Sequence, residues 1–271
     1  MSKRIASMIF CLLLAVAAGC HAKKSQDADS IAYAGAAVIT ENVFPQFLPM
    51  FVEKTGIKMA AIKTVGSQEA VKYVMDGRAD VGGVAHKLTA DELALKPYVQ
   101  TIGFDAVTVV VNTENPITKL TRAQLKGIYT GQITNWKELG WKDLPIHTVS
   151  MTVKGKFGIV KVFQDAVLEG APYGSMAEET DFLYRVAPAV EEKANAIGVT
   201  SYAYQVPRAR TLAVDGIEAN PANLRSKTYP LAREMYLISR EEPTGKVKQF
   251  FDLLLSPEGQ AIVSKKFASA K

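Results

Sequence analysis

Two glycine turns in this sequence place a hydroxyl or lysine side chain where a helix begins. Gly66-Ser67 follows the apolar segment 59–65, and Lys154-Gly155-Lys156 precedes an amphipathic stretch from Ile159 to Leu168. The first backbone N–H groups of a helix are unpaired and lie at the positive end of its dipole, so an anion is a suitable ligand there. The alternative for Ser67 is that it only caps its helix.

The residue types that catalytic sites need do not occur in recognisable patterns. The sequence has no Gly-x-Ser-x-Gly elbow, no Walker loop, no Gly-x-Gly-x-x-Gly and no His-Glu-x-x-His. Its three histidines are scattered, and its two cysteines both lie in the first twenty residues, which leaves no cluster for a metal. We therefore predict no enzyme activity, no cofactor and no metal; a phosphatase is the least favoured alternative.

The first thirty residues have the pattern of an export signal followed by a tether. Lys3 and Arg4 precede the apolar stretch Met8–Ala18, which at about eleven residues is too short to span a bilayer. Small residues then lead directly to Cys20, as in the lipobox of bacterial lipoproteins. We predict a signal peptide at 1–19, a lipid anchor at Cys20, a flexible tether at 20–30 and an extracytoplasmic place in the bacterial cell envelope. The alternative is an ordinary signal peptide with an incidental cysteine.

Composition and charge are ordinary for a globular protein. The 271 residues are 48% hydrophobic and 22% charged, and the formal net charge is +5. It falls to +3 once Lys3 and Arg4 of the signal are left out. Since no run of five basic residues occurs, a nucleic-acid partner is not predicted.

Short apolar strands alternate with helices along the rest of the chain. One helix is predicted to be capped by Thr40 and ended by Gly56, a second is opened by Ser67, and a later one is capped by Thr121. The β-branched run 105–112 predicts a buried strand. This alternation predicts an α/β sheet, whose ligand crevice lies at the carboxyl ends of its strands.

A set of motifs is distributed over essentially the whole chain from residue 31 onward. They are Gly66-Ser67, Asp76-Gly77-Arg78-Ala79-Asp80-Val81-Gly82, Ile102-Gly103-Phe104-Asp105-Ala106-Val107, Leu125-Lys126-Gly127-Ile128-Tyr129-Thr130-Gly131, Ile133-Thr134-Asn135-Trp136, Ala196-Ile197-Gly198-Val199-Thr200-Ser201-Tyr202, Tyr229-Pro230-Leu231-Ala232-Arg233 and Leu255-Ser256-Pro257-Glu258-Gly259-Gln260. Together they resemble the periplasmic phosphate-binding proteins of high-affinity phosphate ABC transporters, which have the two-lobed type II periplasmic-binding-protein fold.

The resemblance implies an α/β protein of two lobes with a hinge of two crossing strands. Mapped onto this chain, the first lobe comprises 31–110 and 208–271, and the second comprises 111–207. The hinge strands are expected at Val107–Val111 and Val206–Leu212. Phosphate or a related oxyanion is expected between the lobes, and an ABC permease as the partner that receives it.

The resemblance also implies a set of ligand-binding residues, with departures from the family pattern. The implied residues are Thr40, Gly66, Ser67, His86, Thr152, Lys154 and Lys156. Ala36, Ala37, Ala85 and Met151, however, stand where the family has hydroxyls or an arginine. A lysine also lacks the bidentate fork of a guanidinium. The alternative function is therefore a domain that has lost phosphate and binds another small ligand or an envelope protein.

Overall fold

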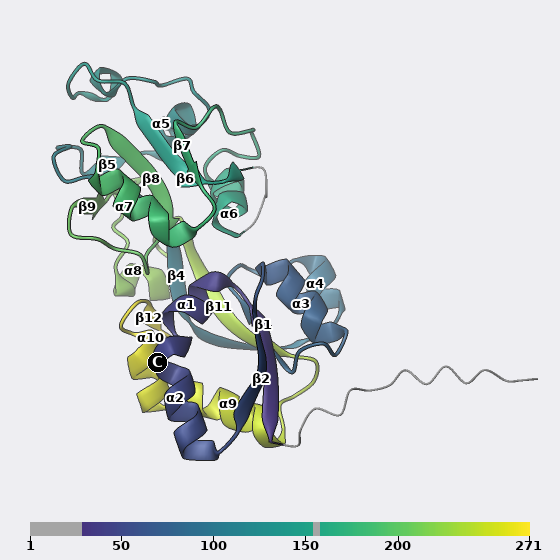
Figure 1. Ribbon diagram of the computed structural model, residues 1–271. Helices are drawn as coiled ribbons and strands as arrows, with labels where there is room; N and C mark the ends of the chain where they lie inside the picture. Colours follow the sequence, from purple (N-terminus) through teal and green to yellow (C-terminus); the bar gives the residue numbers. More distant parts are fainter. Residues whose placement is uncertain (1–28, 154–157) are drawn as a thin grey trace, which may run out of the picture.

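A strand of fifteen residues, β4 (Tyr98–Asn112), runs through both halves of the molecule (Figure 1). The computed structural model describes residues 29–153 and 158–271. Within them, β4 belongs to one continuous sheet with the strand order β2-β1-β3-β11-β4-β8-β6-β7. Helices pack on each half of this sheet, so the two-lobed α/β fold predicted from the sequence is confirmed.

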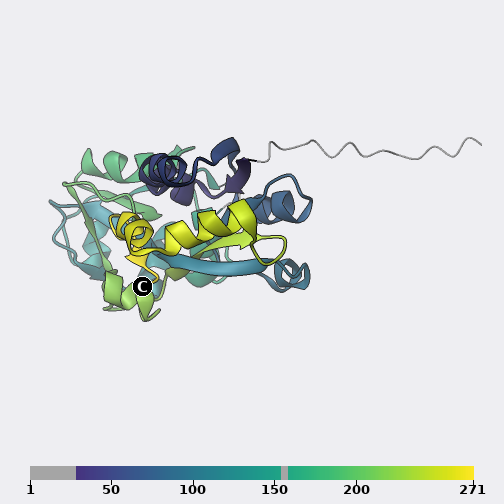
Figure 2. The same cartoon turned by 90° about the horizontal axis from the view of Figure 1, so that it is seen from below.

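The first lobe is built around the half of the sheet that holds β1, β3 and β11. Residues 98–106 of β4 pair antiparallel with β11, and β1 pairs in parallel with β2 and β3. Figure 2 shows α9 and α10 of this lobe in yellow; α9 contacts β1, and α10 contacts β4. The other elements of this lobe and their bounds are β1 (Ser30–Gly35), α1 (Ala37–Asn42), α2 (Phe44–Thr55), β2 (Lys58–Thr64), α3 (Ser67–Met75), β3 (Val81–Val84), α4 (Ala90–Ala94), β11 (Ala232–Ser239), α9 (Gly245–Leu255), α10 (Pro257–Val263) and β12 (Ala268–Ser269).

The second lobe is built around β8, which pairs antiparallel with residues 107–111 of β4 and in parallel with β6. The strand β9 pairs with the last residues of β4, and β5 and β10 form a separate small sheet. Its elements are β5 (Lys119–Leu120), α5 (Arg122–Tyr129), η1 (Trp136–Leu139), β6 (His147–Met151), α6 (Gly158–Ala166), β7 (Glu178–Thr180), η3 (Leu183–Arg185), α7 (Val186–Glu191), β8 (Ala196–Ser201), β9 (Ala209–Thr211), β10 (Ala213–Val214) and α8 (Pro221–Arg225).

Apolar side chains cover both faces of the sheet because neighbouring residues of a strand point to opposite sides. In β1, Ile31 and Tyr33 face the core formed with α2 and α9, whereas Ala34 faces a smaller core beside α3. In β4, Val109 packs with the core beside α5 and α6, whereas Val110 packs against α7. Both lobes therefore have helices on both faces of their sheet. This packing holds the strands, and with them the loops at their ends, in place.

The chain passes between the lobes within β4. Ala106 pairs with Ala232 of β11, whereas the next residue, Val107, pairs with Ser201 of β8. At this junction the Val107 N–H donates to the Leu231 carbonyl and the Ala106 carbonyl accepts from Tyr202 N–H, both at 3.0 Å.

The segment between β9 and β11 contacts both lobes. The strand β9 pairs with residues 110–112 of β4, and Leu212, Leu224 and Leu231 belong to the core of the second lobe. In the same segment, α8 contacts β12 and β11 of the first lobe, so 209–231 packs against both lobes. The boundaries given by the resemblance, with 208–271 in the first lobe, stay a prediction.

The helix predicted to run from Thr40 to Gly56 is divided into two. Thr40 lies inside α1, whose N-cap residue is Ala36, and its hydroxyl donates to the Ala36 carbonyl at 3.3 Å. The predicted cap at Thr40 is therefore wrong. Pro45 lies in the first turn of α2, where the missing N–H of proline is tolerated. The predicted end is confirmed, since Gly56 follows α2 with φ of 72°.

The predicted cap at Thr121 is confirmed. Its Oγ1 accepts from the Gln124 N–H at 3.1 Å, while the Thr121 N–H donates to Gln124 Oε1 at 2.9 Å. We expect Thr121→Ala to lower the free energy of unfolding by about 1 kcal/mol in urea denaturation, because a helix N–H loses its acceptor. Thr113→Ala, at an exposed threonine, is the control. Equal costs for the two variants would contradict this role of Thr121.

Candidate functional site

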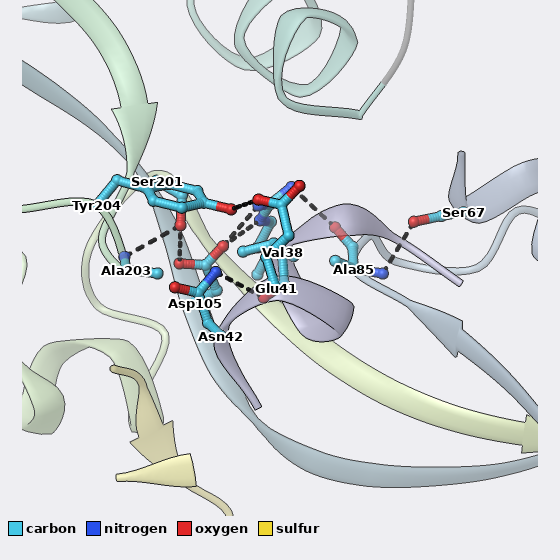
Figure 3. A network of polar contacts seen from close by, with 10 residues as sticks. Val38, Glu41, Asn42, Ser67, Ala85, Asp105, Ser201, Ala203 and Tyr204 are labelled. Atoms are coloured by element: carbon cyan, nitrogen blue, oxygen red, sulfur yellow. Dashed lines mark hydrogen bonds and ion pairs between the residues drawn. The ribbon is translucent and has the colours of Figure 1, made fainter. Parts of the chain in front are cut away.

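Ser67 lies at the start of α3, in the wall of the space between the lobes. Its predicted role as the N-cap is wrong, because Gly66 is the N-cap residue, with φ −67° and ψ 151°, and Ser67 is the first helical residue. Its Oγ instead accepts a hydrogen bond from the Ala85 N–H at 3.0 Å (Figure 3). A hydroxyl that accepts still has its own proton, so Ser67 can also donate to an anion.

A second helix, α6, begins at the same space from the opposite lobe. Gly158, its first residue, lines the same cavities as Ser67. The helix predicted from Ile159 to Leu168 is confirmed, with an earlier end at Ala166. Both α3 and α6 have nine residues, and no side chain caps α3. The positive end of one helix dipole from each lobe therefore borders a common space.

Arg233 on β11 is a buried cation at the floor of this space. It pairs across the sheet with Asp105 of β4, and its Nε and Nη2 donate to Asp105 Oδ2 at 3.0 and 2.5 Å. Its Nη1 donates to the Ala85 carbonyl at 3.1 Å. Asp105 also accepts from Ser201 Oγ at 2.8 Å (Figure 3). One polar network thus connects β8 of the second lobe to Ser67.

Arg233 was not among the predicted site residues, although it ends the motif Tyr229-Pro230-Leu231-Ala232-Arg233. The available signal was a charged residue of each sign in two otherwise apolar strands: Asp105 is fully buried and Arg233 is 7% exposed. Charges are rarely buried unless they are paired. That pattern could have indicated an ion pair, but not its place beside Ser67.

One part of the space, here called the apolar chamber, has a cavity volume of about 320 Å³. Ala36, Val38, Ala85 and Ile159 in its lining are buried. The exposed carboxylates of Glu41 and Asp181 lie at its edge. The full lining is Ala36, Ala37, Val38, Glu41, Thr64, Val65, Gly66, Ser67, Ala85, Met151, Gly158, Ile159, Asp181, Phe182, Leu183 and Arg233.

The adjoining part, here called the charged chamber, has a volume of about 690 Å³. It shares Gly66, Ser67, Gly158 and Arg233 with the apolar chamber. Its lining carries both signs of charge and consists of Gly66, Ser67, Gln68, Glu69, His86, Lys87, Thr89, Gly158, Lys161, Val162, Asp165, Ala166, Lys227, Ala232, Arg233 and Glu234. The two chambers therefore meet where α3, α6 and Arg233 come together.

His86 lines the charged chamber and is held by Glu92. Its Nε2 lies 2.9 Å from Glu92 Oε2, and the same carboxylate accepts from the Thr89 N–H at 2.8 Å. Burial alone would raise the pKa of Glu92, but the hydrogen bonds from Thr89 and His86 outweigh it and hold this pKa below its usual range. His86 is thereby oriented by a carboxylate.

The predicted site residues are only partly brought together. Gly66 and Ser67 border both chambers, and His86 borders one of them. Thr40 and Thr152 are in neither lining; Thr152 Oγ1 donates to Asp181 Oδ1 at 2.8 Å, and Asp181 does line the apolar chamber. Lys154 and Lys156, together with the predicted anchor Cys20 and the signal peptide, lie outside the described residues.

Glu41 of α1 connects the first lobe to the segment that follows β8. Tyr204 Oη donates to Glu41 Oε2 at 2.6 Å (Figure 3). Burial, and then this hydrogen bond to a carboxylate, raise the pKa of Tyr204 well above its usual range. The phenol therefore stays protonated and remains a donor to Glu41 at neutral pH.

Residues 29–153 and 158–271 hold neither a metal-binding cluster nor a membrane-spanning helix. No cluster of three or more His, Cys, Asp or Glu side chains is arranged there to hold a metal ion. None of the helices in these ranges combines the length and the apolar character needed to cross a bilayer.

Comparison with known proteins gives a family match over most of the chain. The model of the PBP superfamily domain matches residues 22–258. The chain is 26% identical over 234 residues to the phosphate-binding protein PstS of Pseudomonas aeruginosa, covering 75% of this chain and 72% of that protein. It is 27% identical over 217 residues to PstS of Bacillus subtilis, covering 78% and 70%.

Solved structures give the same result. A putative phosphate ABC transporter substrate-binding protein from Clostridium perfringens, solved with bound phosphate, is 31% identical, with a TM-score of 0.76 and coverage of 89% of this chain and 100% of that one. An ABC-type phosphate transport receptor from Vibrio cholerae has a TM-score of 0.76 at 23% identity, covering 87% and 98%. The second similarity concerns the fold alone.

Proposed function

Because the chain belongs to the phosphate ABC transporter substrate-binding proteins of the PBP superfamily, we propose that it captures phosphate or a related oxyanion between its two lobes. Members of this family are solute-binding proteins, and binding without catalysis is proposed here as well. The ligand would be delivered to an ABC permease.

The observation that carries this proposal is the meeting of two helix N-termini from different lobes. Ser67 at the start of α3 and Gly158 at the start of α6 border both chambers, and Arg233 lines both as well. Backbone N–H groups, a hydroxyl and an arginine are the donors that bind oxyanions in proteins. An anion at this junction would contact both lobes and favour their closure.

Titration calorimetry of the purified protein with phosphate and sulfate tests this proposal. We expect phosphate to bind and sulfate to bind at least about tenfold more weakly, because hydrogen phosphate can donate a proton to a carboxylate of the charged chamber, Glu69 or Glu234, and sulfate cannot. The control is chloride, which should give no saturable heat. Absence of heat with every oxyanion tried, organic ones included, would overturn the proposal.

The place of the protein is proposed from its N-terminal sequence. Cys20 after small residues would carry a lipid, and the segment 20–30 would hold the two lobes outside the cytoplasmic membrane. Mass spectrometry of the membrane fraction should find a lipid on Cys20, and Cys20→Ser should release the protein from that fraction. Retention of Cys20→Ser in the membrane would contradict the anchor.

A second candidate function is a cleft that no longer binds inorganic phosphate with high affinity. Ala36, Ala37 and Ala85 line the cleft with methyl groups, and Met151 adds another apolar side chain. Each missing charged hydrogen bond would cost about 1.5–3 kcal/mol of binding free energy. This candidate predicts that phosphate gives no saturable heat while another ligand does.

A further inference from the structure

The two chambers differ in the chemistry of their linings, and this difference indicates which substituent the bound oxyanion has. Among the residues that the structure describes, only Gly66, Ser67, Gly158 and Arg233 belong to both linings. On one side of them the lining is largely aliphatic and aromatic, and on the other it carries ionised side chains of both signs. A ligand centred where the two chambers meet, here called the chamber junction, therefore has an apolar environment on one side only.

The chamber junction itself retains donors for an oxyanion. A guanidinium has five N–H groups. Three of those of Arg233 are used, two toward Asp105 and one toward the Ala85 carbonyl. The side chain is 95% buried and lines both chambers, so its remaining N–H groups are available to a ligand there. The Ser67 hydroxyl, 6% exposed as a residue, adds another donor.

Apart from Thr64, Ser67 and Arg233, the described side chains that line the apolar chamber supply no hydrogen-bond donor. Val38 and Ile159 are 4% and 3% exposed, and the half-buried side chains of Val65, Met151 and Leu183 extend the wall. A phosphate ion has oxygen on every side, so the oxygens that face these apolar side chains would lose water without gaining a hydrogen bond from them. A carbon substituent on phosphorus, in contrast, would be favourably buried there.

The two carboxylates of this chamber supply no donor to a phosphate oxygen. Glu41 and Asp181 are exposed and therefore solvated, and each accepts a hydrogen bond from a neighbouring hydroxyl, of Tyr204 and Thr152 respectively. The apolar surface continues to the edge of the chamber in Phe182, whose residue is 48% exposed and whose ring lies 5.5 Å from that of Tyr184. An exposed aromatic ring in the lining is suited to cover an apolar substituent.

We propose that the ligand of this cleft is an organic phosphorus oxyanion, a phosphonate or phosphate monoester with a short apolar substituent. The oxyanion lies at Ser67 and Arg233, and the substituent lies in the apolar chamber against Val38, Ile159 and Phe182. This rests on the proposed function, because it uses the same oxyanion position, and it names the class of substrate for that position.

Titration calorimetry with phosphate and with methyl-, ethyl- and propylphosphonate tests the proposal. Within the phosphonate series the head group is constant, and each added methylene should increase affinity about fourfold. Propyl phosphate, measured alongside, distinguishes the monoester from the phosphonate. If phosphate binds and affinity is flat or falls from methyl- to propylphosphonate, this inference fails while the proposed function stands. If no oxyanion binds, both fail.

A pair of variants tests where the substituent lies. Phe182→Ser should reduce the propyl-to-methyl affinity ratio at least about threefold, because the ring no longer covers the alkyl chain. Leu93→Ser is the control, since Leu93 is 53% exposed and lies outside the linings of both chambers. It should leave the ratio unchanged. If the propyl-to-methyl affinity ratio were the same in both variants, whether reduced or unchanged, the alkyl substituent would not lie in this chamber.

Discussion

Asp105→Ala is expected to lower the free energy of unfolding by about 3–5 kcal/mol, because it leaves the guanidinium of Arg233 buried without its counter-ion. The side chain of Asp105 is fully buried and that of Arg233 is 5% exposed, so water cannot replace the lost carboxylate. Ser201 would lose the acceptor of its hydroxyl in the same variant. Urea denaturation followed by circular dichroism measures the effect.

An exposed ion pair provides the control. Lys248 and Asp252 are four residues apart on α9, with side chains 59% and 60% exposed. Asp252→Ala should cost less than about 0.5 kcal/mol. The double variant with Asp105→Leu and Arg233→Met removes both buried charges and should recover most of the loss. If Asp105→Ala cost no more than Asp252→Ala, the ion pair would not contribute to stability as argued here.

Ser67→Glu is expected to reduce phosphate affinity by about 100-fold or more. The new carboxylate would lie at the N-terminus of α3, where it would take the helix N–H groups and repel an anion at the chamber junction. Like charges brought together cost several kcal/mol, and each 1.4 kcal/mol is a factor of ten in affinity. Calorimetric titration with phosphate measures the change.

Ser67→Gln separates charge from size in this experiment. The glutamine side chain has nearly the shape of glutamate without the charge, and both variants remove the hydroxyl that accepts from the Ala85 N–H. Thermal unfolding of both variants shows whether they are folded. We expect Ser67→Gln to weaken phosphate binding much less than Ser67→Glu; equal affinities would mean that the oxyanion does not lie at α3.

Local patterns predicted those parts of the fold that depend on neighbouring residues. Thr121 caps α5 through a partner three residues away, and Gly56 ends α2 by its own positive φ. Ser67 was misplaced by one position because its acceptor role is decided by the Ala85 N–H, 18 residues further along the chain. The preference of a residue type for a helix N-terminus reflects neighbouring residues, so it does not predict a partner at that separation.

The site depended on contacts that no local pattern contains. Arg233 and Asp105 are 128 residues apart and meet only because β11 and β4 pair antiparallel in one register. Similarly, Thr152 contacts Asp181 from the end of β6, a partner 29 residues away. The resemblance gave the family and the position of α3, whereas the chemistry of the two chambers required the packed structure.

The position in β4 where the chain passes between the lobes affects the kinetics of ligand binding. The Val107 N–H and the Ala106 carbonyl belong to neighbouring residues and are bonded to different segments, so one continuous strand joins the lobes there rather than a loose linker. A ligand that is bound to one lobe therefore binds the other in a first-order step. The effective concentration of the second lobe at the ligand is set by the geometry of this connection. The rate of ligand binding to the first lobe rises with ligand concentration, whereas the rate of lobe closure does not. The observed rate of formation of the closed complex therefore reaches a plateau at high ligand concentration.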